Sequence, residues 1–180
     1  MIEYRVDIYS LDRRERYVLS ETMNGIACGE KKLVLNSNPL SRTMLKDMVL
    51  CSGPDMIILC HYNEGRLLLT DQDGLYNNFI KEAVKATGGN VFLVVTGLSS
   101  SGGVLADKRV VSSLVSNGQS SIQYIDSARR LLTWDGAPSR DQLEHLQLAV
   151  RGKVDPLETP ETILRHCFAK KVKAFYCVLL

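Results

Sequence analysis

A glycine- and serine-rich loop is the first place in this chain where the residue types suit ligand chemistry. The run from Gly97 to Gly103 contains three glycines and three serines, and it follows the strongly apolar segment Val91 to Val95. Loops after buried strands form ligand sites in doubly wound folds, and backbone N–H groups in such loops can hold phosphates. This loop contains no lysine and no acidic metal ligand, so a surface connection is the simpler interpretation. A serine nucleophile would also need a GxSxG turn with His and Asp partners, and the chain has no GxSxG.

The first predicted strand leads into a turn that lacks the residues of a phosphate-binding loop. Residues 4–11 alternate as in a strand, and a helical pattern runs from Arg16 to Met23. A phosphate loop between them would need glycines, whose N–H groups wrap the anion, followed by Lys and Ser or Thr. No glycine occurs before Gly25. We therefore expect no cofactor, and if the fold belongs to the GTPase class, we expect it to have lost the nucleotide.

Two Cys and His neighbours are the remaining candidates for catalysis, Cys60 with His61 and His166 with Cys167. Such a pair can supply a thiolate nucleophile and its base. Adjacent residues on a strand point to opposite faces, and adjacent residues on a helix do not face each other. We therefore predict that Cys60 is a core residue and that the chain has no catalytic site. His145 is predicted to face solvent on an amphipathic helix.

Composition favours one soluble globular domain. The chain has 180 residues, of which 45% are hydrophobic and 23% charged, and this suits a single domain over residues 1–180 with a C-terminal tail at about 170–180. The net charge of +2 gives no support for direct nucleic-acid binding. The five cysteines show neither a CxxC pair nor a histidine at zinc spacing, so no disulfide framework or metal site is expected. No secretory signal or membrane span is evident, which favours a reducing compartment.

Strand and helix patterns alternate along the chain. We expect strands at 4–11, 31–35, 55–60, 91–95 and 122–125. We expect helices at 16–23, 41–50, from a capping box at 70–73 to Gly88, then around 107–116, after Ser139, and at about 161–175. This order predicts an α/β fold of three layers, with a mostly parallel sheet flanked by helices.

The last four residues, Cys177-Val-Leu-Leu, fit a prenylation box and follow a small basic cluster. A lipid with a basic patch would give the two signals that stable membrane anchoring requires. The alternative is that the apolar end packs onto the domain and buries Cys177.

Two short segments resemble a Ras-like GTPase skeleton. Residues 123–129, Gln-Tyr-Ile-Asp-Ser-Ala-Arg, resemble the short strand and base-contacting turn of small GTPases, and residues 35–39 stand where a DxxG-type strand end is expected. Where a guanine-reading motif would follow Val95, the chain reads Thr-Gly-Leu-Ser and lacks both its lysine and its aspartate. The fold that this resemblance implies is small-GTPase-like without a phosphate-binding loop.

Within that class the chain is similar to the centromere protein M family over nearly its whole length. The likeness rests on the first strand without a phosphate loop, the segment 32–40, Pro54-Asp55 before a buried strand, 91–97, 110–111 and 119–126. The resemblance implies a non-catalytic, nucleotide-free pseudo-GTPase subunit of the inner kinetochore, located at the centromere in the nucleus and acting in cell division. It implies that the subunit stabilises centromere protein I, together with centromere proteins H and K.

The resemblance fixes no partner residues, so candidate interface positions come from the sequence itself. The run Leu67, Leu68 and Leu69 beside Arg66 is more apolar than a connection needs, which suits an interface patch or an additional edge strand. Trp134, the single tryptophan, is either an exposed partner anchor or a core residue.

Two other functions stay open at this point. The first is a prenylated, membrane-tethered adaptor at the cytoplasmic membrane surface that resembles the immunity-associated GTPases. That likeness rests on residues 52–55, Gly65-Arg66 and the acidic helix start at Asp71. The second is an enzyme of another α/β family that uses the loop from Gly97 to Gly103, although no paired acid, base or metal set accompanies it.

Overall fold

The computed structural model describes residues 2–50, 53–63, 76–98, 105–116 and 120–157. Five strands of these residues form one sheet in the order β2-β1-β3-β4-β5, and each neighbouring pair is parallel. The strands are β1 (Ile2–Ser10), β2 (Lys31–Pro39), β3 (Met56–Tyr62), β4 (Val91–Thr96) and β5 (Leu131–Trp134). This is one of the two common strand orders of doubly wound α/β sheets.

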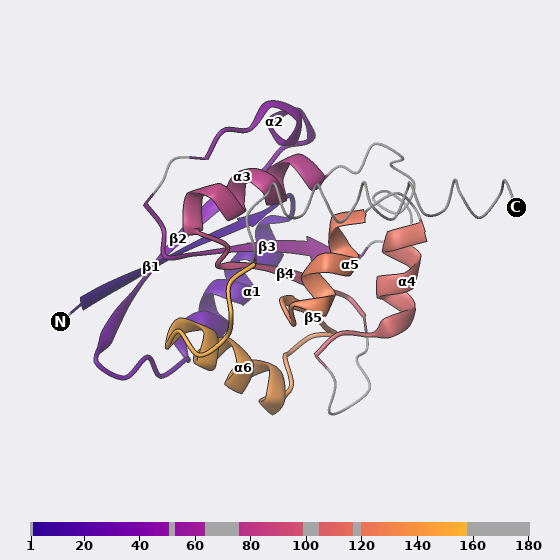
Figure 1. The fold of residues 1–180 in the computed structure, drawn as a ribbon. Coiled ribbons are helices and arrows are strands. Elements are labelled where there is room, and N and C mark those ends of the chain that lie inside the picture. The colour runs from indigo at the N-terminus through magenta and orange to yellow at the C-terminus, as the bar shows by residue number, and fades with distance from the viewer. Residues whose placement is uncertain (1, 51–52, 64–75, 99–104, 117–119, 158–180) are drawn as a thin grey trace, which may run out of the picture.

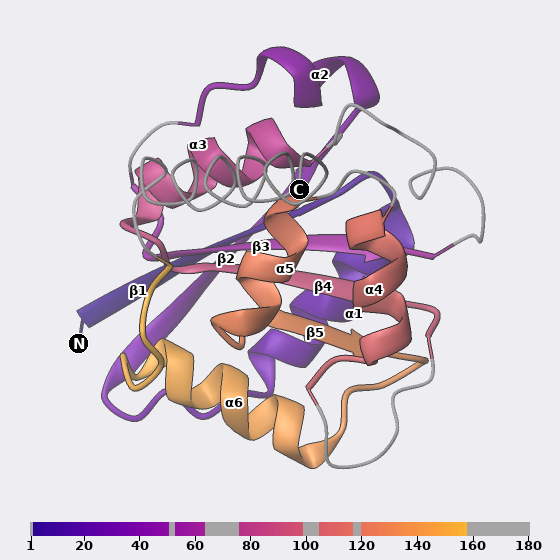
Figure 2. The same ribbon diagram turned by 45° about the vertical axis from the view of Figure 1, so that its right-hand side comes forward.

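Six described helices cover the sheet on both faces (Figure 1). They are α1 (Arg13–Asn24), α2 (Arg42–Asp47), α3 (Asn77–Thr87), α4 (Lys108–Ser116), α5 (Ser120–Ser127) and α6 (Arg140–Val150). Figure 2 shows α1 and α6 below the sheet and α2 and α3 above it, with α4 and α5 packed side by side. The predicted α/β class, with three layers and a parallel sheet, is confirmed.

Two apolar clusters fill the spaces between the layers, because β3 and β4 are buried on both faces. Ile57, Leu59 and Leu93 pack toward α3, α4 and α5. Ile58 and Phe92 point the opposite way and pack with residues of α1 and α6. A continuous apolar run in each of these strands is therefore the sequence signal of a sheet covered twice.

The ends of several helices lie at the capping residues that the sequence predicts. Ser139 caps α6 in a capping box with Gln142, and Ser41 accepts a hydrogen bond from the Met44 N–H at the start of α2. Gly88 ends α3 in the left-handed conformation at φ 65°, which residues with a side chain adopt only at a cost in energy. The helix predicted at 41–50 is shorter, because the chain becomes extended at Met48. The capping box at 70–73 and the helix at 161–175 lie outside the described residues.

One predicted strand is wrong. Residues 122–125 belong to α5, where Ile122 and Ile125 are three residues apart and both buried, as on one face of a helix. The last strand is β5, which is absent from the predicted strands, and all four of its residues are buried. The second strand is also longer than predicted, because residues 36–39 continue the pairing with β1 and the Asn36 side chain donates a 2.8 Å hydrogen bond to Asp7.

Candidate functional site

The turn between β1 and α1 is where doubly wound folds commonly hold a phosphate, and here it is closed by the chain's own polar groups. The carboxylate of Asp12 accepts a 2.9 Å hydrogen bond from the Glu15 N–H, so it caps α1. The Asp12 N–H donates to Ser10 Oγ at 3.0 Å, and the Arg16 guanidinium donates to the Ser10 carbonyl at 2.8 Å. A carboxylate therefore occupies the helix N-terminus that would attract a phosphate.

The Cys60 and His61 side chains diverge, as the strand alternation predicts. Cys60 is 1% exposed in the cluster beneath α1 and α6, and burial raises the pKa of its thiol well above the ordinary value. His61 points to the other face, where its Nδ1 lies 3.1 Å from the hydroxyl of Tyr76. The thiol therefore stays protonated and does not face His61, and its burial confirms the predicted core role of Cys60.

His61 lines a pocket at the carboxyl ends of β3 and β4. The pocket has a volume of about 370 Å³, and its polar lining includes Asn63, Asp107 and Arg109. Burial lowers the pKa of His61 to about 4, so the imidazole is neutral at pH 7 and is a weak base there. Arg109 pairs with Asp107 at 3.0 Å, so the one cation among the described residues of this lining is already neutralised.

The glycine-rich loop enters this same end of the sheet. Gly97 has φ +75°, and a Cβ there would approach the ring of Tyr62 to 3.0 Å, so glycine suits this position for two reasons. The Leu98 N–H donates to the Trp134 carbonyl. Residues 99–104 lie outside the described part of the chain, so the predicted loop site is described only at its first two residues.

Of the predicted interface residues, only Trp134 lies in the described part of the chain. Trp134 is 2% exposed within β5, so it is a core residue and the expectation of an exposed anchor is wrong. Its burial follows from its place in a strand that both helical layers cover. Arg66, Leu67, Leu68 and Leu69 lie outside the described residues, as does Cys177.

His145 is a further correction, since it is buried at 7% exposure and does not face solvent. Its Nε2 lies 2.7 Å from the carbonyl oxygen of Arg129, and its ring meets the ring of Phe92 edge-on with centroids 5.9 Å apart. Burial lowers the pKa of His145, so this imidazole packs against the sheet in its neutral form. The helical pattern placed His145 correctly in α6 but on the wrong face.

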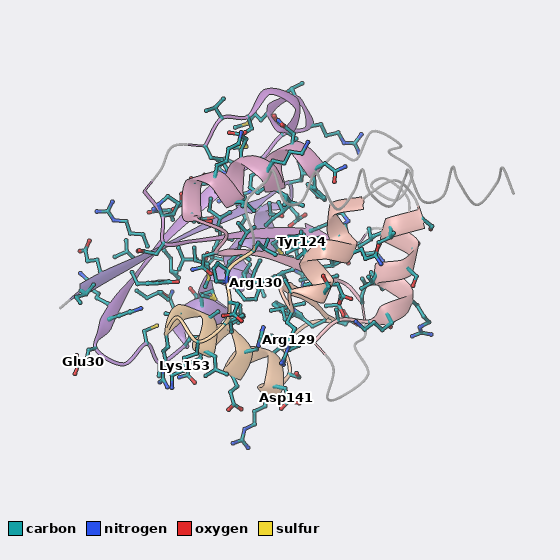
Figure 3. All side chains as sticks on the ribbon, viewed as in Figure 1. Glu30, Tyr124, Arg129, Arg130, Asp141 and Lys153 are labelled. Atoms are coloured by element: carbon teal, nitrogen blue, oxygen red, sulfur yellow. The ribbon has the colours of Figure 1, made fainter. Side chains whose placement is uncertain are left out.

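A buried polar network at the amino ends of the strands was missed by the sequence reasoning. The guanidinium of Arg130 is 1% exposed and donates to Asn90 Oδ1 and to the carbonyls of Val154 and Asp155. It also lies 4.6 Å from the centre of the Phe92 ring. In Figure 3, Arg130 lies among the central side chains, whereas Arg129 lies beside α6.

Asn90 extends this network to β1 and to the residue before β3. Its amide nitrogen donates to the hydroxyl of Tyr4 and to the carbonyl of Asp55, each at 2.6 Å. The one signal in the sequence is an arginine directly before a short apolar run, Leu131-Leu132-Thr133-Trp134. Since the network binds the chain to itself, its role is structural.

No group of three or more His, Cys, Asp and Glu side chains among the described residues could hold a metal ion. Within the same residues, no helix is both long and apolar enough to cross a membrane.

Comparisons with known proteins give a distant structural likeness. Neither a protein-family model nor a curated protein matches the chain. Among solved structures, a short-chain flavodoxin associated with a bacterial microcompartment is similar with a TM-score of 0.35 and 13% sequence identity. The match covers 86% of this chain and 97% of the flavodoxin.

Proposed function

We propose that this protein is a non-catalytic pseudo-GTPase scaffold, which binds no nucleotide and stabilises partner subunits of the inner kinetochore. The observation that carries the nucleotide-free part is the first turn, where Asp12 caps α1 and no glycine is present. A phosphate at this position would meet the Asp12 carboxylate in place of free N–H groups, and two anions there repel each other.

The protonation states of the Cys60 thiol and the His61 imidazole also support a non-catalytic role. The Cys60 thiol is buried and held protonated, and the His61 imidazole has a pKa of about 4. A general base at neutral pH works best with a pKa near 7, and a cysteine nucleophile works as the thiolate. Neither group meets its requirement, so the proposal assigns them to packing.

The kinetochore assignment rests on the resemblance to the centromere protein M family. The proposed partner is centromere protein I, with centromere proteins H and K, at the centromere in the nucleus. The experiment is purification of the tagged chain from its own cells, with the tag at the N-terminus so that Leu180 is free. Recovery of those three proteins supports the proposal, and their absence from a purification that recovers the intact chain contradicts it.

A prenylated adaptor is the second candidate, and the Cys177-Val-Leu-Leu sequence favours it. The same purification tests it through the intact mass of the chain, since a prenyl group adds a lipid-sized mass at Cys177. A Cys177→Ser variant is the matched control, because a prenylated protein leaves membranes when this thiol is lost. Membrane release together with loss of the added mass would replace the kinetochore proposal with the tethered adaptor.

Nucleotide binding is tested separately on the purified chain. Titration with a fluorescent GTP analogue in the presence of Mg²⁺ is expected to give no saturable binding up to millimolar concentration. Asp12→Ala removes the capping carboxylate and is expected to cost about 1 kcal/mol of stability without creating a nucleotide site, because the turn still lacks glycines and a lysine. Saturable binding by the unmodified chain would refute the pseudo-GTPase proposal.

A further inference from the structure

Strand β2 is a long edge of the sheet. It pairs with β1 through all of its nine residues, and no strand of the described residues pairs with its other side. Alternate residues of a strand direct their backbone groups to the same side, so about half of these nine offer hydrogen-bonding groups outward. Typical strands have about five or six residues, so this edge is long enough to pair with an extended segment.

The charge that often protects such an edge is confined to its first two residues, of which Lys32 is exposed and Lys31 is engaged by its own chain. Lys31 lies over the ring of Tyr4, 4.6 Å from its centre, and its ammonium donates a 2.9 Å hydrogen bond to the carbonyl of Val150. Pro39 lacks an N–H and stands at the far end of the strand. Between them, residues 33–37 carry no charged side chain. Protection by lysine or proline is thus confined to the two ends of β2.

A groove runs beside this edge, between β2 and α1. Its volume is about 450 Å³, and Leu35 and Ser37 of β2 line it together with Arg13, Arg16 and Tyr17 of α1. Tyr17 is 67% exposed, which makes it one of the large apolar side chains of the described surface that face solvent. A strand added to β2 would place every second side chain over this groove.

The groove is basic. Neither Arg13 nor Arg16 forms an ion pair within the described residues, and Arg16 uses one nitrogen to bind the Ser10 carbonyl. Arginine beside an exposed aromatic ring is a typical pairing at protein recognition sites, because the guanidinium binds a carboxylate and the ring contacts apolar groups. The complementary ligand is therefore acidic on the side that faces α1.

We propose that β2 and α1 form a docking site for an extended acidic segment of a partner protein, which pairs with β2 as a further strand of the sheet. The backbone hydrogen bonds supply part of the affinity, and side chains at alternate positions supply the specificity. An Asp or Glu of the segment binds Arg13 and Arg16, and an apolar neighbour two residues away contacts Tyr17 and Leu35. The proposal rests on the scaffold function, to which it adds the chemistry of one partner contact.

The experiment begins with selection of twelve-residue peptides from a random library displayed on phage, using the full-length protein. The best peptide is then titrated into the isotope-labelled protein, and amide shifts are followed by NMR. We expect selected peptides to carry Asp or Glu with an apolar residue two positions away, and to shift amides of residues 31–38 and of α1. We also expect binding to weaken as salt rises, because the contact is partly electrostatic.

The test variant combines Arg13→Glu with Tyr17→Ala, two exposed residues whose replacement leaves the core intact. We expect it to bind the selected peptide at least tenfold more weakly. Arg140→Glu is the matched control, since Arg140 is exposed and lines a different groove, between α1 and α6. The control is expected to bind as the unmodified protein does.

Four outcomes of the peptide experiments would overturn the docking proposal. They are selected peptides without the acidic pattern, shifts confined to other surfaces, no enriched peptide at all, or concentration-dependent dimers in which β2 pairs with a second copy. The scaffold function is judged independently by the purification from cells. If the double variant recovers the kinetochore subunits as well as the unmodified chain does, the docking site is wrong and the scaffold proposal stands.

Discussion

The buried guanidinium of Arg130 connects β5 and β4 to the segment that follows α6. It donates to three acceptors, which are Asn90 Oδ1, the Val154 carbonyl and the Asp155 carbonyl. Burial lowers the pKa of Arg130 to about 10, so the side chain remains charged at pH 7. Its hydrogen-bond acceptors are one side-chain amide and two backbone carbonyls, and none of them is a carboxylate.

Replacing Arg130 with Met keeps an unbranched apolar stem and removes every one of these hydrogen bonds. A buried acceptor left unpaired costs about 1–3 kcal/mol. Asp155 is exposed, so water can replace the bond to its carbonyl, whereas Val154 and Asn90 are half-buried. Two half-buried acceptors are then left without a donor. This cost is partly offset because the variant no longer buries the charge of the guanidinium. We therefore predict that Arg130→Met lowers the free energy of unfolding by about 2–4 kcal/mol.

Urea unfolding followed by the fluorescence of Trp134 measures this loss, because Trp134 is the single tryptophan and is buried in β5. With a denaturant slope of about 2 kcal/mol per molar, the midpoint should fall by about 1–2 M. Arg14→Met is the control: Arg14 is exposed, and the change should stay within about 0.5 kcal/mol. A midpoint for Arg130→Met equal to that of the control would refute the assigned role of this network.

Two further predictions concern packing and pH. Gly89 has φ +96°, and a Cβ there would overlap the Leu157 carbonyl, so Gly89→Ala should lower the free energy of unfolding by about 2–4 kcal/mol. Gly136→Ala, where φ is +68° and the space is open, should cost only about 1–2 kcal/mol, and equal losses in urea unfolding would contradict the overlap. His61 binds a proton near pH 6.5 when unfolded but near pH 4 when folded, so stability should fall as pH drops through this range, by at most about 1.4 kcal/mol per pH unit. Unfolding curves at several pH values should show a shallower fall for His61→Gln, and an unchanged slope would count against the burial of this imidazole.

The elements with a strong local signal were predicted from the sequence. The apolar runs at β3 and β4, the Ser139 cap and the glycine that ends α3 each have a physical cause within a few residues. α5 was predicted as a strand because Ile122, Tyr124 and neighbouring residues also fit strand alternation. Short apolar segments of this kind satisfy both periods, so only tertiary packing decides between them.

The candidate sites depend on contacts that no local pattern contains. Arg130 meets Asn90 and Asp155 across 40 and 25 residues of sequence, and the partners are an amide and carbonyls that carry no compositional signal. His145 was placed on the wrong face because its buried partner is a backbone carbonyl. The groove beside β2 requires the strand order, which the sequence left open between several parallel arrangements.

The two ends of the sheet differ in how their polar groups are used. At the amino ends, Asn90 and Arg130 join β1, β3, β4, β5 and the segment after α6 into one buried network. At the carboxyl ends, where doubly wound enzymes hold their ligands, Asp12 caps α1 and Asp107 neutralises Arg109. Arg13, which forms no ion pair within the described residues, lies on the outer surface of α1 beside β2. Free charge beside a strand edge that no described strand pairs with suits recognition of another chain, which is why the proposed docking site lies at the edge of this sheet and not at its carboxyl end.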